Sequence, residues 1–211
     1  MIRDELARLI EEGYNGLGEL EFAESSNGYL IYHWADRNPS AEARVYRSIE
    51  DARQIAKYDA NGAYRPLKGA PNLPRGWVIE LTTIDELKRA LDYFYPGAIA
   101  TWLAYQAGTA HPVCLRQTLS RQTGMYRATR KISDKQAEDL VKEVCRSDSR
   151  CLRTILWGID DHRPPDFLPR SKSDPNVDQT GQNRAALPFP CLEACNLLVA
   201  AARTTMKKSS S

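Results

Sequence analysis

The sequence predicts an α+β protein, with a small mixed N-terminal domain that holds a short antiparallel sheet, followed by a mainly helical domain. Apolar residues alternate in two segments near the N-terminus, which is the period of half-buried strands. Capping boxes at Thr83–Glu86 and Ser133–Gln136 each precede an apolar pattern of helical period. All the cysteines lie in the second half of the chain. We place the domains at residues 1–92 and 93–203, with a disordered tail at 204–211.

Local patterns define the elements of the N-terminal domain. In chain order they are a helix at 3–12, strands at 19–22 and 29–34, a helix capped by Ser48, a strand at 77–81 and a helix opened by Thr83. Residues 25–28, Ser-Ser-Asn-Gly, are typical of a hairpin turn between the first two strands. Three prolines and two glycines in residues 64–77 predict an extended loop.

The C-terminal domain is predicted to be helical around a long loop. Pro96 suits the first turn of a helix, and Ser133 opens another, whose apolar face leads to Cys145 at its edge. Residues 152–159 fit either a buried strand or a short helix. Polar residues and prolines in residues 160–190 predict an irregular loop, and Pro190 precedes a last helix from Cys191 to about Arg203.

Composition indicates an ordinary globular protein, with 42% hydrophobic and 27% charged residues and a net charge of +2. The charged N-terminus lacks the apolar segment of a secretory signal, and no apolar run reaches the roughly 18–20 residues that span a membrane. We therefore expect a cytoplasmic protein, without membrane partners, in which disulfides are rare. Five cysteines in such a compartment require another explanation.

Four of these cysteines form two pairs, Cys145-x5-Cys151 and Cys191-x3-Cys195, each placed at a predicted helix end. Cys191 and Cys195, four apart in the first turn of a helix, would direct both sulfurs from one face. Helix N-termini favour the thiolates that metals bind. Three basic residues beside the first pair could offset the negative charge of a metal–thiolate site: Arg146, Arg150 and Arg153.

The spacing of the cysteines leaves three alternatives open. An iron–sulfur cluster and a structural zinc ion both use thiolates, and neither the C-x2-C-x2-C run of ferredoxins nor a second tight zinc knuckle is present. The cysteines could also be small buried side chains. Cys114 has no near partner in the sequence, so we interpret it as a buried residue.

Long strings of residues resemble a known family. They are Tyr64–Lys68, Ala70–Leu73, Arg75–Trp77, Tyr95-Pro96, Leu115-Arg116, Arg121–Arg127, Cys145–Asp148, Cys151-Leu152, Thr154–Trp157, Pro190-Cys191, Glu193 and Cys195–Leu198. Together they resemble the stabilising domain and the [4Fe–4S] cluster-binding domain attached to CbiX-like, chelatase-related proteins of the Deinococcus type. The resemblance implies that Cys145, Cys151, Cys191 and Cys195 bind one [4Fe–4S] cluster. It places no ligand at Cys114.

The resemblance does not extend to the chelatase half of those proteins. Chelatases of that class use active-site histidines, and here His33, His111 and His162 are scattered. We therefore expect electron transfer or redox sensing, linked to tetrapyrrole or metal metabolism only in trans and by analogy. The alternative is a structural zinc-binding module with the same four cysteines. A third alternative is an enzyme in which one iron of the cluster is free to bind a substrate. Four cysteine ligands argue against it, because they leave no iron without a protein ligand.

A basic stretch lies between Asp92 and Asp134, where no acidic residue occurs. It contains Arg116, Arg121, Arg127, Arg130 and Lys131, with Trp102, Tyr105 and Tyr126 among them. It is either a solvated face or a surface for an acidic redox protein or a tetrapyrrole-pathway protein. A sequence pI near 8.2 does not favour nucleic acid as a partner.

Overall fold

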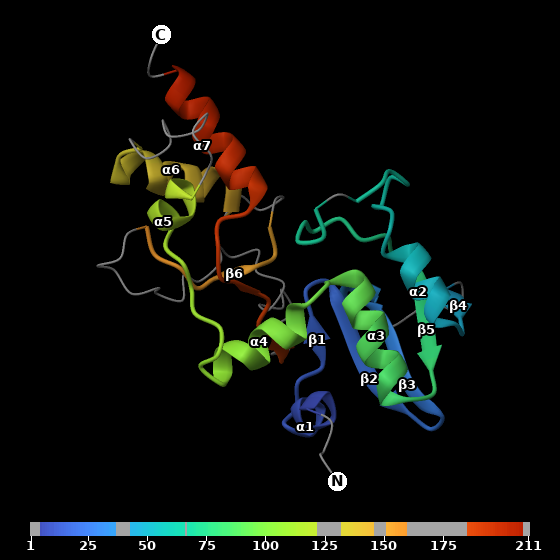
Figure 1. The fold of residues 1–211 in the computed structure, drawn as a ribbon. Coiled ribbons are helices and arrows are strands. Elements are labelled where there is room, and N and C mark those ends of the chain that lie inside the picture. Colours follow the sequence, from blue (N-terminus) through green and yellow to red (C-terminus); the bar gives the residue numbers. More distant parts are fainter. Residues whose placement is uncertain are drawn as a thin grey trace. The chain divides into compact units, whose positions relative to one another are not determined.

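The computed structural model describes residues 5–36, 43–65, 67–121, 132–145, 151–159 and 185–208. These residues form two compact units, one within residues 1–100 and 174–189 and the other within 101–173 and 190–211. Figure 1 shows a sheet with helices in the first unit and mainly helices in the second, which confirms the predicted α+β class. The chain leaves the first unit within α4 (Ala98–Gln106). The predicted boundary at residue 92 stays a prediction.

The first unit is built on a mixed sheet with the strand order β4-β5-β3-β2-β1-β7. Its strands are β1 (Gly16–Leu17), β2 (Leu20–Ser25), β3 (Gly28–His33), β4 (Arg44–Tyr46), β5 (Trp77–Leu81) and β7 (Ala186–Leu187). The central pairs are antiparallel, as predicted, whereas β4 pairs with β5, and β7 with β1, in parallel. The sequence did not predict β1, β4 or β7, because strands of two or three residues are too short to show a period.

The hairpin between β2 and β3 confirms the turn predicted at residues 25–28. Ser25 pairs with Gly28, and the ladder continues to Leu20 opposite His33. Gly28 has a φ of +136°, and a Cβ atom there would lie 2.1 Å from the carbonyl oxygen of Leu81. Both the turn and the neighbouring strand therefore require glycine at this position.

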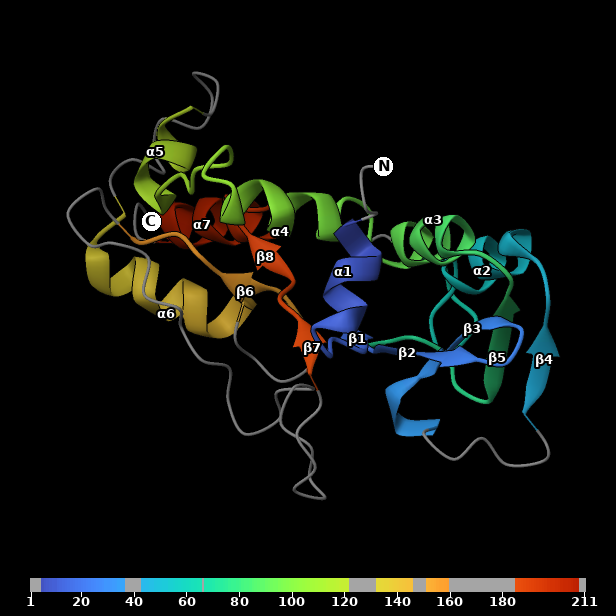
Figure 2. The same cartoon turned by 90° about the horizontal axis from the view of Figure 1, so that it is seen from below.

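Helices α2 (Ile49–Ile55) and α3 (Ile84–Phe94) pack side by side on one face of the sheet, and α1 (Glu5–Glu11) also contacts α3 (Figure 2). A short 3-10 turn (Trp34–Asp36) follows β3. The predicted caps are present: the hydroxyl of Ser48 accepts the Glu50 N–H at 3.0 Å, and that of Thr83 accepts the Glu86 N–H at 3.2 Å. Leucine, isoleucine and phenylalanine side chains from these helices and strands form the buried core.

Besides the end of α4, the described residues of the second unit form α5 (Leu115–Ser120), α6 (Asp134–Cys145), β6 (Thr154–Ile155), β8 (Pro190–Cys191) and α7 (Asn196–Lys208). The Ser133–Gln136 capping box forms as predicted, with backbone-to-side-chain distances of 2.9 and 3.2 Å. Helices α6 and α7 pack against each other around Leu140, Val141 and Leu198 (Figure 1). Of residues 152–159, for which a buried strand and a short helix were the alternatives, Thr154–Ile155 form strand β6 and the others are in neither a strand nor a helix.

Two predictions for the C-terminal half need correction. Of the loop predicted at 160–190, residues 160–184 lie outside the described part, but Ala186–Leu187 and Pro190–Cys191 are strands, because each has a partner distant in sequence. The last helix begins at Asn196 and continues to Lys208, beyond the predicted end at Arg203. Among the helices that the structure describes, none combines the length and the apolar character needed to cross a bilayer.

Candidate metal centre

The four cysteines predicted as ligands all belong to the second unit. Cys145 is the last residue of α6, is half-buried and packs against the core of the unit. Cys151, also half-buried, precedes β6 by three residues. Cys191 is buried in β8, and Cys195 is exposed and directly precedes α7.

A two-stranded parallel ladder joins the two halves of this ligand set. Thr154 of β6 pairs with Pro190 of β8, and Ile155 pairs with Cys191. The Leu156 N–H donates to the carbonyl oxygen of Cys191 at 3.1 Å. The segment that follows Cys151 is thus hydrogen-bonded to the segment that carries Cys191.

The placement of Cys191 corrects the prediction that it shares the first turn of a helix with Cys195. Cys191 lies in β8, and only Cys195 lies at the helix start, where its carbonyl oxygen accepts the Val199 N–H at 3.0 Å. Pairing with β6 satisfies the backbone of Cys191 in a way that an isolated helical turn cannot, because the first N–H groups of a helix have no partner within it. The two sulfurs therefore do not leave one helical face.

The surroundings of Cys191 act on its ionisation in opposite directions. Burial raises the pKa of the Cys191 thiol, while the indole N–H of Trp157 and the charge of Arg153 favour the thiolate and lower it. The distance from Trp157 Nε1 to Cys191 Sγ is 3.5 Å. Cys195 is near enough to raise the same pKa, since two thiolates repel. A bound cation would remove this repulsion and hold both groups as thiolates.

Cys195 has a different environment. It directly precedes α7, a helix of thirteen residues whose N-terminal N–H groups favour negative charge. Its side chain is exposed, whereas that of Cys191 is buried. The pair therefore offers one buried and one solvent-facing thiol.

The donor set fits a metal or cluster by its chemistry, since four thiols are the ligands of iron–sulfur and zinc sites. Within the described ranges, no three His, Cys, Asp or Glu side chains come close enough to hold a metal ion. Cys114 serves another purpose, because it caps α5 with its Sγ accepting the Gln117 N–H at 3.3 Å.

Several other predicted residues lie apart from this set or outside the described ranges. Arg116 is paired with Asp134 across the start of α6, and Arg121 closes α5. His111 is exposed and His33 belongs to the first unit. The residues outside the described ranges are Tyr126, Arg127, Arg130, Lys131, Arg146, Arg150 and His162.

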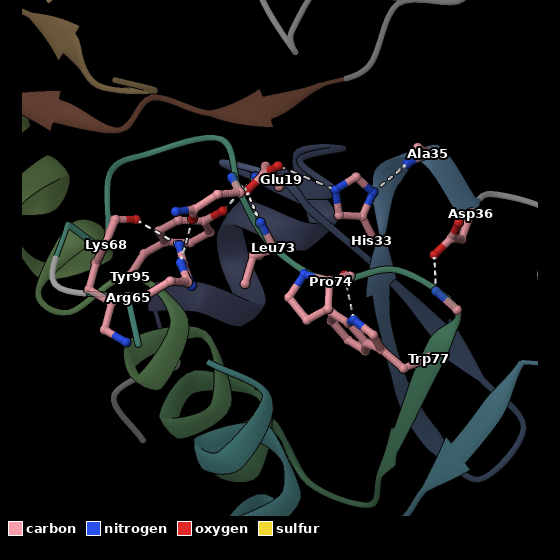
Figure 3. A network of polar contacts seen from close by, with 12 residues as sticks. Glu19, His33, Ala35, Asp36, Arg65, Lys68, Leu73, Pro74, Trp77 and Tyr95 are labelled. Atoms are coloured by element: carbon pink, nitrogen blue, oxygen red, sulfur yellow. Dashed lines mark hydrogen bonds and ion pairs between the residues drawn. The ribbon is translucent and has the colours of Figure 1, made fainter. Parts of the chain in front are cut away.

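The first unit contains a buried polar network that the sequence did not predict (Figure 3). Oxygen Oε2 of Glu19 accepts the N–H groups of Asn72 and Leu73, both at 2.9 Å. Its Oε1 lies 3.4 Å from Nε2 of His33, whose Nδ1 accepts the Ala35 N–H at 3.1 Å. Because Nδ1 of His33 accepts a hydrogen bond, Nε2 is the ring nitrogen that donates to Glu19.

Arg65 forms the other half of this network. Its guanidinium is fully buried and donates to Asn72 Oδ1 at 2.7 Å, to the Lys68 carbonyl at 3.0 Å and to the Ala56 carbonyl at 3.4 Å. Burial lowers the pKa of Arg65, an effect opposed by Tyr95 and Glu19. These bonds join residues within the predicted loop at 64–77 and tie the loop to Ala56 at the end of α2. An arginine in a loop is usually exposed, so no local signal marked it.

Comparisons with known proteins divide the chain in two. Residues 107–204 match the family described as a 4Fe-4S iron-sulfur cluster binding domain, and residues 2–106 match the DR2241 stabilising domain. The crystal structure of DR2241 from Deinococcus radiodurans is similar at 25% identity and a TM-score of 0.72, over 96% of this chain and 40% of that one. That protein is described as multi-domain, with structural similarity to chelatases and two additional novel domains. No curated protein matches the sequence.

Proposed function

Since the chain joins a member of the DR2241 stabilising-domain family to a member of a 4Fe-4S cluster-binding family, we propose that Cys145, Cys151, Cys191 and Cys195 hold its cluster for electron transfer or redox sensing. The two matches confirm the resemblance read from the sequence and the [4Fe–4S] cluster as the cofactor. The ligand set and the redox role are the parts that we propose.

One observation carries the proposed ligation: all four cysteines lie in one compact unit and within the matched residues 107–204. Cys191 and Cys195 are near enough for their charges to interact. Cys145 and Cys191 both pack at the same apolar core. Cys114 is engaged in capping α5, which supports leaving it out of the set.

The number of protein ligands supports a redox role over substrate turnover. A [4Fe–4S] cluster supplies one-electron chemistry and, with four cysteine thiolates, has no iron position open to a substrate. Cys195 is the exposed ligand, so it offers the shortest path to a partner at the surface. The donor or acceptor would be another one-electron redox protein.

The charge of the basic stretch and the similarity to DR2241 each indicate a class of partner. An acidic redox protein would complement the basic stretch, of which Arg121 is exposed and Arg116 is already paired with Asp134. The similarity to DR2241 supports a tetrapyrrole-pathway protein as the other candidate, because that protein resembles chelatases. This chain spans 40% of DR2241, so the activity of the whole protein is not carried over.

The test is a serine scan of the full chain, purified without oxygen. We expect brown protein whose visible absorption bleaches with dithionite, and we expect each of C145S, C151S, C191S and C195S to lose most of its iron and acid-labile sulfide. C114S is the matched control and should keep them. Colourless protein with one zinc ion would contradict the proposal, and so would an empty site in C114S with one of the four cysteines dispensable.

A further inference from the structure

The indole of Trp157 is the feature of the metal centre that the proposed function leaves unexplained. Its side chain is 2% exposed, and its Nε1–H donates to Sγ of Cys191 at 3.5 Å. A buried indole N–H normally finds a polar partner, and oxygen acceptors are the usual choice. Here the partner is the sulfur of a proposed cluster ligand.

The segment that carries Trp157 is also hydrogen-bonded to the backbone of Cys191. Ile155 and Cys191 are register partners in the β6–β8 ladder, and Leu156 donates to the backbone of Cys191. Trp157 lies two residues beyond the end of β6, and its indole Nε1 reaches the Cys191 sulfur. One short segment thus holds the backbone of Cys191 through Leu156 and its sulfur through Trp157.

The contact suits a thiolate better than a thiol. As a thiol, Cys191 donates its S–H to the carbonyl oxygen of Glu193 at 3.1 Å. Ligation removes that proton, and the hydrogen bond to Glu193 is lost with it. The indole N–H remains a donor, and a donor is favoured more strongly as its sulfur becomes more negative.

We propose that Trp157 is a positioning residue that donates a hydrogen bond to the Cys191 sulfur and raises the reduction potential of the bound cluster. This inference depends on the proposed ligation by Cys191. Reduction adds one electron and breaks no bond, so the extra negative charge is shared by the sulfurs. Hydrogen bonds to the sulfurs are among the factors that set such potentials, and the low dielectric of a buried site strengthens them.

The experiment compares two tryptophan-to-phenylalanine variants of the cluster-loaded full chain. Trp157→Phe removes the N–H and keeps most of the aromatic packing. Trp102→Phe is the matched control, because Trp102 is also buried in the second unit while its Nε1 has no hydrogen-bond partner among the described residues. Iron and sulfide content are measured first, and midpoint potentials then come from a dithionite titration followed by visible absorption.

We expect both variants to keep the cluster and only Trp157→Phe to become harder to reduce. The expected change in the reduction equilibrium is about tenfold, which is about 59 mV for one electron. If the midpoint potential of Trp157→Phe equals the potentials of wild type and of Trp102→Phe, the inference is overturned. The ligand assignment would then remain intact. If instead C191S keeps its cluster, the proposed ligation fails before Trp157 is tested.

A second measurement covers the case in which Trp157→Phe does not fold. Wild-type protein grown with tryptophan labelled with 15N at the indole nitrogen is reduced with dithionite and studied by electron–nuclear double resonance. A 15N coupling to the reduced cluster is expected from a donor that contacts a ligand sulfur. Its absence would overturn the inference without any variant.

Discussion

Glu19→Gln is the substitution that best tests the buried network of the first unit. Both oxygens of the Glu19 carboxylate accept hydrogen bonds, two from the backbone at Asn72 and Leu73 and one from His33. Glutamine has the same shape, but its side chain has a single acceptor oxygen. That oxygen should remain toward Asn72 and Leu73, where it makes two contacts, so the amide nitrogen then faces the protonated Nε2 of His33.

The cost of this change follows from the fixed tautomer of His33. Its Nδ1 accepts the Ala35 N–H, so the proton cannot move from Nε2 without breaking that bond. Two donors then face each other in a site where Glu19 is 6% and His33 1% exposed. A buried donor without an acceptor costs about 1–3 kcal/mol. With an m-value of about 2 kcal/mol/M, the urea midpoint should fall by about 0.5–1.5 M.

The matched control is Glu80→Gln, on β5 of the same sheet. Glu80 makes an ion pair with Arg47 at 2.8 Å, and the two side chains are 44% and 75% exposed. Exposed ion pairs contribute about 0–1 kcal/mol, so this midpoint should move little. Urea unfolding followed by tryptophan fluorescence in a Trp102→Phe/Trp157→Phe background measures both variants, because Trp77 is buried against Phe94 in this unit. Equal midpoints for the two variants would refute the role assigned to the second carboxylate oxygen.

Three further predictions concern the hairpin, a helix cap and the cofactor. Gly28→Ala should lower the free energy of unfolding by at least about 1 kcal/mol, because φ is +136° and the new Cβ would meet Leu81; an unchanged urea midpoint would contradict this. Hydrogen bonds from Thr82 lower the pKa of Glu86, so their contribution to stability is complete above the ordinary pKa and is lost as pH falls through the lowered one. Glu86→Gln should therefore be less stable than wild type at neutral pH and equal to it in strong acid, as measured by urea midpoints at both pH values. Removing the iron with a chelator should speed amide exchange in residues 107–204 before residues 2–106, because a bound cofactor stabilises the part that holds it; equal exchange in both would count against the assignment.

Short-range features of this protein were readable from the sequence. Thr83 and Ser133 each cap a helix through a residue three positions further on, and both capping boxes formed as expected. Strand β5 has the predicted bounds, Trp77–Leu81, and the hairpin at 25–28 turns where its residues indicate. In each case the interacting groups are neighbours in the chain, so the local pattern contains the information.

Long-range pairing determined the rest. Cys191 and Cys195 have helical spacing, yet Cys191 lies in a strand because its partner, Ile155, comes from a segment that the local pattern cannot specify. Glu19 is bonded to backbone groups 53 and 54 residues away, and its burial depends on them. Residue type and spacing singled out two pairs of cysteines but left a cluster, a zinc ion and buried thiols as alternatives, and the family resemblance implied the cluster ligands. Which thiol is buried beside an indole N–H and which one faces solvent depends on the tertiary structure. Cys191 is placed by strand pairing, because its partner segment is distant in the sequence.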